Sequence, residues 1–303
     1  MMPTLLILFG PTAIGKTDLS ISLAKHFNSE IFSCDSRQFF KELEIGVAKP
    51  SKEQLSAIKH HFIDSISIFD HYSISKFEFD CIAELENYFK THEFAIMCGG
   101  SGLYIDAVCD GVDEMPDHDP EIRKEVIKLY TESGIEALRF ELRKIDPVFY
   151  EQVDLKNAQR IMRAIETYRQ IGIPFSEIRK NVKIKRNFNI IKIGLNIDRN
   201  ILYDRINLRV DKMFEDGLLE EAKSLFKYKD LIPLKTIGYR EIFDFVENKI
   251  SLEEAVEKIK INTRRYAKRQ ITWFKKYSDA KYFNPQDEKQ IIEYLTFLFS
   301  KPF

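Results

Sequence analysis

The chain has 303 residues, of which 44% are hydrophobic and 31% charged, and its formal net charge is −1. These values are typical of a water-soluble protein with one large or two modest domains. The sequence argues against a membrane protein, because no apolar run approaches the roughly 20 residues that span a bilayer.

The N-terminal MMPTLLILFG is too short for a secretory signal and lacks the basic start of one. The four cysteines form no C-x-x-C pair and the six histidines form no H-x-x-x-H pattern. We therefore expect a cytoplasmic protein with reduced, mostly buried thiols and without structural zinc.

Residues 4–17, TLLILFGPTAIGKT, carry a short apolar run followed by the pattern G-x-x-x-x-G-K-[ST]. This pattern predicts a strand that turns through a phosphate-binding loop into a helix at 15–27. The N–H groups of such a loop form a nest for anions, and the start of the helix adds its positive dipole end. Lys16 adds a full charge, and the Thr17 hydroxyl can ligate Mg²⁺. The loop is therefore expected to bind a di- or triphosphate.

Residues 30–34 predict a second strand, and Asp35 follows its end. Functional side chains gather at the C-terminal ends of parallel strands, so Asp35 is expected near the phosphate loop if the two strands are neighbours. The alternative is an aspartate that caps a turn or a helix. A helix is expected at 73–90.

A third strand is expected at 94–98 and runs into Gly99-Gly100-Ser101-Gly102. Nucleotide hydrolases usually end this strand with an aspartate that helps to hold Mg²⁺ and water. Because glycines follow the strand here, we expect the loop to hold a leaving group rather than a phosphate that water attacks.

The acidic, proline-containing segment 112–120 ends the alternation of strands and helices. Beyond it, helices are expected from Asp119 or Pro120 to Thr131, from Gly134 to Lys144 and from Asn157 to Gln170. We interpret 115–188 as a helical insertion domain, and 1–114 together with 189–303 as an α/β core domain.

The sheet is expected to resume at 189–195. The helices expected after it are 199–214, 218–227, Leu252–Tyr277 and a last one within 286–303. Arg205 and Arg209 are four residues apart and therefore project from one face of their helix.

Two segments are basic on an otherwise neutral chain: 179–197 and 258–276 contain no acidic residue. Such blocks indicate a localised contact with a polyanion, although a solvated basic face is the common alternative. In the long helix, basic residues alternate with aromatic ones, a pattern that suits RNA. The competing interpretation places Tyr266, Ile271 and Phe274 in the core, and both can hold on different faces.

In their order, these motifs resemble the tRNA dimethylallyltransferases over almost the whole chain. The matching pieces are GPTAIGKT at 10–17, DSRQ at 35–38, GVAKP at 46–50, HHFID at 60–64, GGSGLY at 99–104, the segment 146–166, RINLRVDKM at 205–213, and IGYREI and RYAKRQITWF within 237–274.

The resemblance implies a P-loop NTPase-like parallel sheet with a helical insertion. The implied reaction transfers a dimethylallyl group from dimethylallyl diphosphate to N6 of the adenosine 3′ of the anticodon in tRNA. In this family the two substrates enter opposite ends of a channel above the loop. The resemblance also implies that the insertion closes over the anticodon stem-loop, and we expect a monomer.

The family resemblance implies a role for each matching site residue. Asp35 would be the general base, Thr17 would share Mg²⁺ with the diphosphate, and Arg209 rather than Arg205 would bind the leaving group. The diphosphate-binding loop would consist of Gly10, Pro11, Thr12, Ala13, Ile14, Gly15, Lys16 and Thr17.

The positions that match RNA-contacting residues of the family are Asp35, Ser36, Arg37, Gln38, Ser101, Arg123, Gln159, Arg160, Ile161, Met162 and Arg163. Weaker RNA candidates are Arg240 and the segment from Lys268 and Arg269 to Trp273. Ser101 is a departure, because the family usually has threonine there; the hydroxyl is kept and a methyl is lost.

Two other functions fit parts of the pattern. A P-loop small-molecule kinase would use Asp35 as the residue that activates the acceptor. An RNA-binding module would keep the phosphate loop without its activity.

Overall fold

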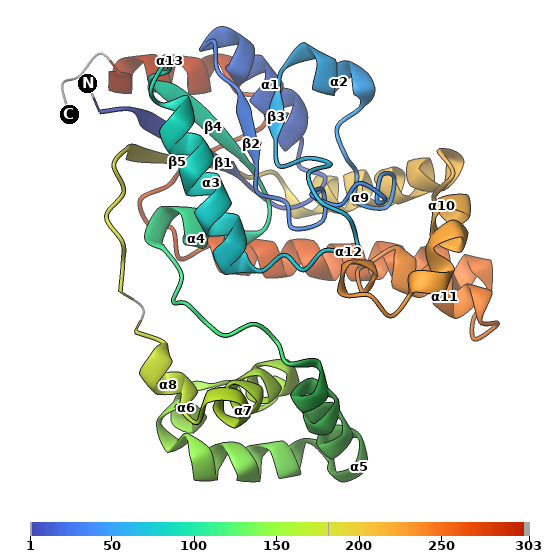
Figure 1. Cartoon of the computed structure of the whole chain (residues 1–303). Helices are drawn as coiled ribbons and strands as arrows, with labels where there is room; N and C mark the ends of the chain where they lie inside the picture. Colours follow the sequence, from blue (N-terminus) through green and yellow to red (C-terminus); the bar gives the residue numbers. More distant parts are fainter. Residues whose placement is uncertain (1, 181, 300–303) are drawn as a thin grey trace. The chain divides into compact units, whose positions relative to one another are not determined.

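The computed structural model describes residues 2–180 and 182–299, and the chain divides into two compact units (Figure 1). The sheet unit consists of Met1–Tyr72, Asp80–Cys109 and Arg186–Phe303. The helical unit consists of Ser73–Phe79 and Asp110–Lys185. The expected insertion was 115–188. The observed helical unit instead runs from Asp110 to Lys185 and also includes Ser73–Phe79.

Within the described residues, six parallel strands form one sheet in the order β3-β2-β4-β1-β5-β6. The strands are β1 (Thr4–Phe9), β2 (Ile31–Ser33), β3 (His60–His61), β4 (Phe94–Gly99), β5 (Asn189–Leu195) and β6 (Lys281–Phe283). The predicted parallel α/β fold is confirmed.

The condition under which the sequence placed Asp35 near the phosphate loop, adjacency of the first two strands, is not met. β1 and β2 are not neighbours, because β4 lies between them and pairs with both. Ile96 of β4 is in register with Leu6 on one side and Ile31 on the other. Proximity of Asp35 to the phosphate loop therefore cannot come from adjacent strands; it comes from the common edge at which parallel strands end.

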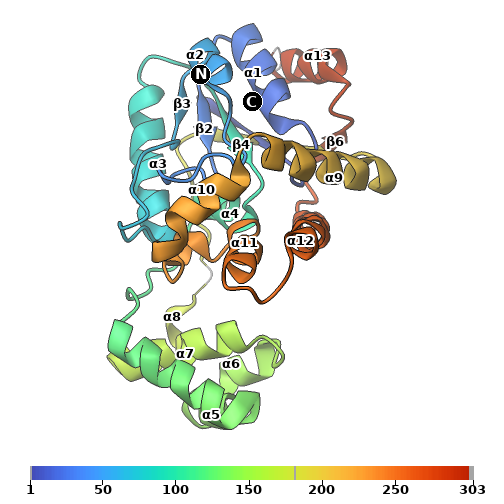
Figure 2. The same ribbon diagram turned by 90° about the vertical axis from the view of Figure 1, so that its right-hand side faces the viewer.

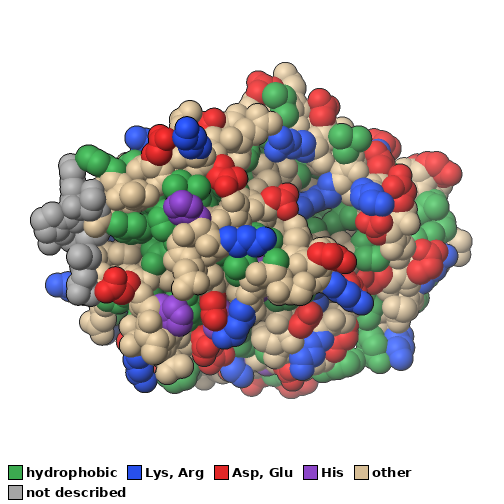
Figure 3. Space-filling model, turned by 90° about the horizontal axis from the view of Figure 1, so that it is seen from above, with side chains coloured by type: hydrophobic (Ala, Val, Ile, Leu, Met, Phe, Trp, Pro, Cys, Tyr) green, Lys and Arg blue, Asp and Glu red, His purple; other side chains and the backbone are tan. Residues whose placement is uncertain are grey.

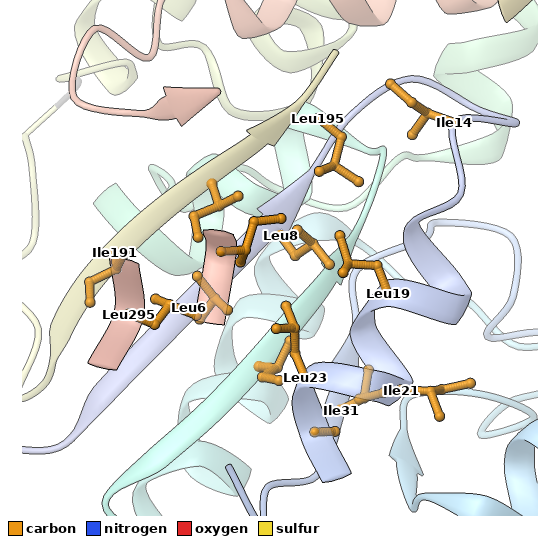
Figure 4. Packing of buried hydrophobic residues seen from close by; sticks show 14 of the residues in the cluster. Leu6, Leu8, Ile14, Leu19, Ile21, Leu23, Ile31, Ile191, Leu195 and Leu295 are labelled. Carbon is orange, nitrogen blue, oxygen red and sulfur yellow. The ribbon is translucent and has the colours of Figure 1, made fainter. Parts of the chain in front are cut away.

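The core surrounds β1, whose six residues are all buried. Helices cover both faces of a parallel sheet, which is why such a strand is apolar throughout. On one face, Leu6 and Leu8 pack with Leu19 of α1 (Lys16–His26) and Leu295 of α13 (Glu288–Phe299) (Figure 4). On the other face, the ring of Phe9 lies 4.8 Å from that of Phe274 at the end of α12.

The remaining helices of the sheet unit are α2 (Lys52–Ala57), α4 (Gly102–Asp110), α9 (Arg199–Glu215), α10 (Leu218–Leu225), α11 (Tyr239–Val246) and α12 (Leu252–Phe274). Single 3-10 turns lie at Phe226–Tyr228 and Ile232–Leu234. Helix α3 (Ile74–Tyr88) begins in the helical unit and ends in the sheet unit. Figure 2 shows α9 to α12, which pack against one another along the same side of this unit.

Several elements differ from the sequence-based expectation. Helix α12 ends at Phe274 rather than Tyr277, because the N–H of Tyr277 bonds the carbonyl of Phe274 in a tight turn at 3.0 Å. Helices α2 and α11 and the short strand β6 were not predicted. The last helix is described up to Phe299, and residues 300–303 of that prediction lie outside the described residues.

The helical unit contains α5 (Pro120–Ile145), α6 (Pro147–Gln152), α7 (Ala158–Ile171) and α8 (Phe175–Ile178). Helix α5 is interrupted at Gly134, whose φ of 72° and ψ of −172° are not helical. The two helices predicted on either side of this glycine are thereby confirmed. Asp146 ends α5 and caps α6 by accepting the N–H of Phe149 at 2.9 Å.

Candidate active site

A cavity of about 440 Å³ opens in the sheet unit at the C-terminal edge of the strands. Its lining comes from the phosphate loop, from Asp35 to Gln38 after β2, from the segment 46–50, from the turn after β4, and from α9, α10 and α12. The structure thus gathers in one cavity motifs that are more than 200 residues apart in the sequence.

The phosphate loop turns into α1 at Gly15. Gly15 has a φ of 102° and precedes α1, a backbone conformation that side chains strongly disfavour. The Lys16 ammonium donates to the carbonyls of Gly10 at 3.0 Å and Pro11 at 2.8 Å. Burial lowers the pKa of Lys16, and the nearby Arg209 lowers it further. This cation is poorly solvated, so an anion in the cavity would stabilise it.

Helix α9 brings two arginines to the loop, and they bind different atoms. Arg209 Nη1 donates to the Thr12 hydroxyl at 3.1 Å, and its side chain lines the cavity. Arg205 Nη1 donates to the Ile14 carbonyl at 3.1 Å. The first arginine is therefore available to a ligand, whereas the second supports the loop.

Asp35 faces the same cavity from the end of β2. Its Oδ1 accepts the N–H of Arg37 at 3.0 Å, so the carboxylate also holds a turn. The two interpretations offered for this residue, a site residue and a turn cap, are thus compatible. Its charge acts on Lys16 and on Arg209, since it raises the pKa of each against the lowering effect of burial.

Ser101 follows the glycines after β4 and keeps the hydrogen bond expected of a hydroxyl there. Its Oγ accepts the N–H of Ser36 at 3.2 Å and lies 3.4 Å from the Ser36 hydroxyl. Gln38, in contrast, donates its amide to the Ala48 carbonyl at 3.0 Å and so holds the segment 46–50. Because Ser36 is next to Asp35, its hydrogen bonds with Ser101 hold the segment that carries Asp35.

Comparisons with known proteins agree with one another. The model of the IPP transferase family matches residues 38–277. A tRNA dimethylallyltransferase of Christiangramia forsetii is 49% identical, over 96% of this chain and 97% of the relative.

The chain belongs to this family.

Solved structures place the family on the same fold. The tRNA isopentenylpyrophosphate transferase of Bacillus halodurans is 33% identical, with a TM-score of 0.71 over 97% of this chain and 95% of that one. A eukaryotic dimethylallyltransferase acting on tRNA has a TM-score of 0.80 at 23% identity, over 99% of this chain and 80% of that one, and shows the shared fold.

Gln270 lines the cavity, although the sequence assigned it a different role. It lies in the segment expected to contact RNA, yet it is only 6% exposed and points into the protein. Its Oε1 accepts the N–H of Thr12 at 2.9 Å, and its Nε2 donates to the Gly100 carbonyl at 2.9 Å. For Gln270, the expectation of RNA contact is corrected because its amide is already occupied on both sides.

The glycines after β4 explain how α12 comes so close. A Cβ on Gly100 would lie 2.3 Å from the Gln270 amide, and a Cβ on Gly102 would lie 2.2 Å from the Trp273 ring. Gln270 and Trp273 are three residues apart and thus share a helix face. Gly100 therefore faces Gln270, and Gly102 faces Trp273. The two glycines and the two large side chains are visible in the sequence, but only the structure shows that they pack together.

Helix α12 presents two kinds of basic side chain. One kind binds neighbouring helices: Lys260 binds Asp211 and Arg264 binds Asn207, while Lys276, just after the helix, binds Asp106. The other kind, Lys268 and Arg269, is exposed to solvent. Tyr266 and Ile271 are partly buried and Phe274 is buried, so the helix has a core face and a basic face, as the combined interpretation predicted.

Among the described residues, the face of the molecule seen from above carries no purely basic region comparable to a basic helix face (Figure 3). Basic and acidic side chains are interspersed over the face seen in Figure 3. Mixed charges of this kind do not attract a polyanion strongly. Arg240, the remaining weaker candidate, is half exposed and lies 3.5 Å from Glu241.

In the helical unit, the candidate RNA residues surround the buried carboxylate of Glu166. Arg123 binds Glu166 with one nitrogen and donates with the other to Gln159 Oε1 at 2.9 Å. His118 Nδ1 lies 2.9 Å from Glu166. Burial by itself would raise the pKa of Glu166, but the hydrogen bonds from His118 and Arg123 outweigh it and lower that pKa.

Two RNA candidates of the helical unit must be corrected. Ile161 is 0% and Met162 2% exposed, and both belong to the core formed by α5, α6 and α7. Their side chains have no surface to offer RNA, because the apolar stripe of α7 is what holds this unit together. Gln159 and Arg160 are exposed and Arg163 is partly buried, so these three keep a polar surface.

Two further observations concern candidate binding partners. Of the helices in residues 2–180 and 182–299, none is both long and apolar enough to cross a membrane. Across those same residues, no three His, Cys, Asp or Glu side chains gather as metal ligands would.

Proposed function

We propose that this protein transfers the dimethylallyl group of dimethylallyl diphosphate to N6 of the adenosine 3′ of the anticodon in tRNA, releasing diphosphate. The proposal rests on membership of the IPP transferase family and on the names of its relatives. The observation that carries it is one cavity that combines an anion-binding loop, Arg209 and Asp35.

The chemistry follows from these three components. As the new C–N bond forms between N6 and the allylic carbon, the C–O bond to diphosphate breaks and N6 loses a proton. The exocyclic amine of a purine is a weak nucleophile, so Asp35 takes that proton as general base. The diphosphate leaves with the bonding electron pair, and the loop N–H groups, Lys16 and Arg209 stabilise its charge.

We also propose that the Thr17 hydroxyl would hold a Mg²⁺ ion when the diphosphate is bound. Mg²⁺ prefers oxygen ligands and is commonly held by one or two protein groups together with phosphates. Thr17 lines the cavity and follows Lys16, which fits that requirement. When bound, the ion would offset the negative charge of the leaving group.

The acceptor base must leave its stack to enter a cavity, which costs less in a single-stranded loop than in a duplex. Arg37 and Ser36 line the cavity and are candidates to hold the base. We propose that Arg123, Gln159, Arg160 and Arg163 of the helical unit and the exposed face of α12 contact the anticodon stem-loop. The monomeric state and the cytoplasmic location stay predictions.

The test is a transfer assay with labelled dimethylallyl diphosphate and bulk tRNA, followed by analysis of the nucleosides. We expect label in N6-isopentenyladenosine and a requirement for Mg²⁺. Steady ATP turnover without prenyl transfer would contradict the proposal and favour the small-molecule kinase, for which the family match and the named relatives give no support.

A further inference from the structure

Resting on the function proposed above, we propose that Gln270 is a positioning residue that holds Thr12 and thereby aligns the phosphate loop with Arg209. It binds a backbone N–H of the loop at 2.9 Å and the carbonyl after β4, also at 2.9 Å. A single side chain of α12 thus joins the loop after β1 to the turn after β4.

The effect on the leaving-group site passes through Thr12. Its N–H is held by Gln270, and its hydroxyl accepts from Arg209 at 3.1 Å. If the N–H is released, Thr12 can move, and the direction of the Arg209 guanidinium changes with it. Electrostatic stabilisation of a leaving group depends on donors that are already in place, so a loosened loop binds diphosphate less well.

The environment of Gln270 fixes its orientation. The side chain is 6% exposed, and both ends of its amide have a partner. The carbonyl oxygen can only accept and the NH₂ can only donate, so these two partners also determine which way the amide lies. Gly100 leaves room for this amide, because a Cβ there would lie 2.3 Å from Nε2.

Helix α12 carries this residue and also exposes Lys268 and Arg269. The same rigid element therefore bears the loop support on one face and candidate RNA contacts on another. Gln270 is separate from those contacts, so its loss should affect the diphosphate and leave tRNA affinity unchanged.

The experiment compares wild type with Gln270→Met, which keeps the length of the side chain and removes both hydrogen bonds. The matched control is Gln290→Met, the same change at an exposed glutamine of α13. Affinity for inorganic diphosphate with Mg²⁺ and for tRNA is measured by calorimetry, and KM, kcat and Tm are measured alongside.

For Gln270→Met we expect diphosphate affinity to fall about tenfold, because Arg209 is no longer held in place and one hydrogen bond from it to the ligand is worth roughly that factor. The KM for dimethylallyl diphosphate should rise and kcat should fall, with tRNA affinity near that of wild type and of Gln290→Met. Tm should be lower than in both, because the N–H of Thr12 and the carbonyl of Gly100 lose a buried partner. Unchanged diphosphate affinity would overturn the proposal, as would an equal loss of affinity for diphosphate and for tRNA.

A second variant tests the same contact from the other side. Gly100→Ala should displace the Gln270 amide and reproduce the loss of diphosphate affinity. In a Gln270→Ala background the added methyl no longer meets the amide and its nearest neighbour is the Gly10 carbonyl at 3.3 Å, so Gly100→Ala should cause a smaller further loss. Additive losses would contradict the mechanism.

If wild type binds diphosphate but transfers no prenyl group, the proposed function fails, whereas the binding results still decide the role of Gln270.

Discussion

Arg205 and Arg209 lie one helical turn apart on α9, yet they act on different parts of the phosphate loop. Arg205 reaches the backbone of Ile14, and Arg209 reaches the Thr12 hydroxyl beside the cavity. The sequence alone places both on one helix face. The tertiary contacts separate the arginine that faces the ligand from the one that supports the loop.

Substitution of Arg209 tests its role at the leaving group. Arg209→Ala should lower the single-turnover rate of transfer roughly 10²–10³-fold, as the loss of one preorganised donor typically does. Lys212→Ala is the control on the same helix, because Lys212 is 64% exposed and pairs with Asp216. Equal rates for the two variants would show that Arg209 does not stabilise the departing diphosphate.

Asp35 allows a substitution that separates its two roles. Asp35→Asn keeps an oxygen that can accept the N–H of Arg37, so the turn is retained. It cannot act as a base, and transfer should fall about 10²–10⁴-fold. Binding of tRNA, measured by filter retention, should stay near wild type. Normal transfer by the asparagine variant would exclude Asp35 as the base.

At the scale of single elements, helix α12 combines a core face with a basic face. Exposed cations bind RNA by displacing counterions, so their contribution depends on salt. Lys268→Gln with Arg269→Gln should weaken tRNA binding and reduce the slope of log K against log salt by about 1–2. The control is Lys289→Gln, an exposed lysine on α13. An unchanged slope would mean that this face of α12 is only solvated.

Helix α5 depends on the backbone conformation at Gly134. Its φ of 72° and ψ of −172° belong to a region that only glycine occupies readily. Gly134→Asn should therefore destabilise the helical unit by about 1–3 kcal/mol.

The control variant is Gly172→Asn. Gly172 has the same φ of 72° as Gly134 but a ψ of 5°, a conformation that asparagine tolerates. Neither glycine has a neighbouring atom within 4 Å of an added Cβ. Any difference between the two asparagine variants in urea unfolding therefore reports backbone conformation. Equal losses would show that the kink does not require glycine.

At the scale of the whole molecule, the two units have separate cores, which can be followed by separate signals. Trp273, the one tryptophan of the chain, lies in α12 of the sheet unit. Hydrogen exchange of the α7 amides reports the helical unit, whose core is formed by α5, α6 and α7. Each unit is therefore expected to show its own response to substitutions in its core.

Glu166 makes the helical unit sensitive to acid. Its folded-state pKa lies below the ordinary value of 4.5, because the hydrogen bonds from His118 and Arg123 outweigh the effect of burial. A depressed carboxyl pKa contributes stability that is present above the unfolded pKa and is lost as the pH falls through the folded pKa. Protection of the α7 amides should thus decrease below about pH 4.5.

Glu166→Gln removes this titration and should flatten the pH dependence, at the cost of lower stability near neutral pH. The Trp273 fluorescence transition of the sheet unit should be the same in both proteins. If the hydrogen-exchange protection of the α7 amides in the wild-type protein does not change as the pH falls, the role assigned to Glu166 is contradicted.

The class of fold, the phosphate loop and the family resemblance could all be predicted before the structure was known. These features depend on local patterns: apolar strands, glycines where the backbone must turn, and Lys16 and Thr17 at fixed spacing in the loop. The separation of two helices near Gly134 was equally predictable, because a few neighbouring residues decide it.

Which side chains meet depends on tertiary packing and could not be predicted. The position of β4 between β1 and β2 depends on how distant strands pair, and no local pattern encodes that. Burial of Ile161 and Met162, and the inward direction of Gln270, likewise depend on which helix face packs against its neighbours. A residue in a basic helix can therefore resemble an RNA contact in the sequence and still hold the phosphate loop in the folded protein.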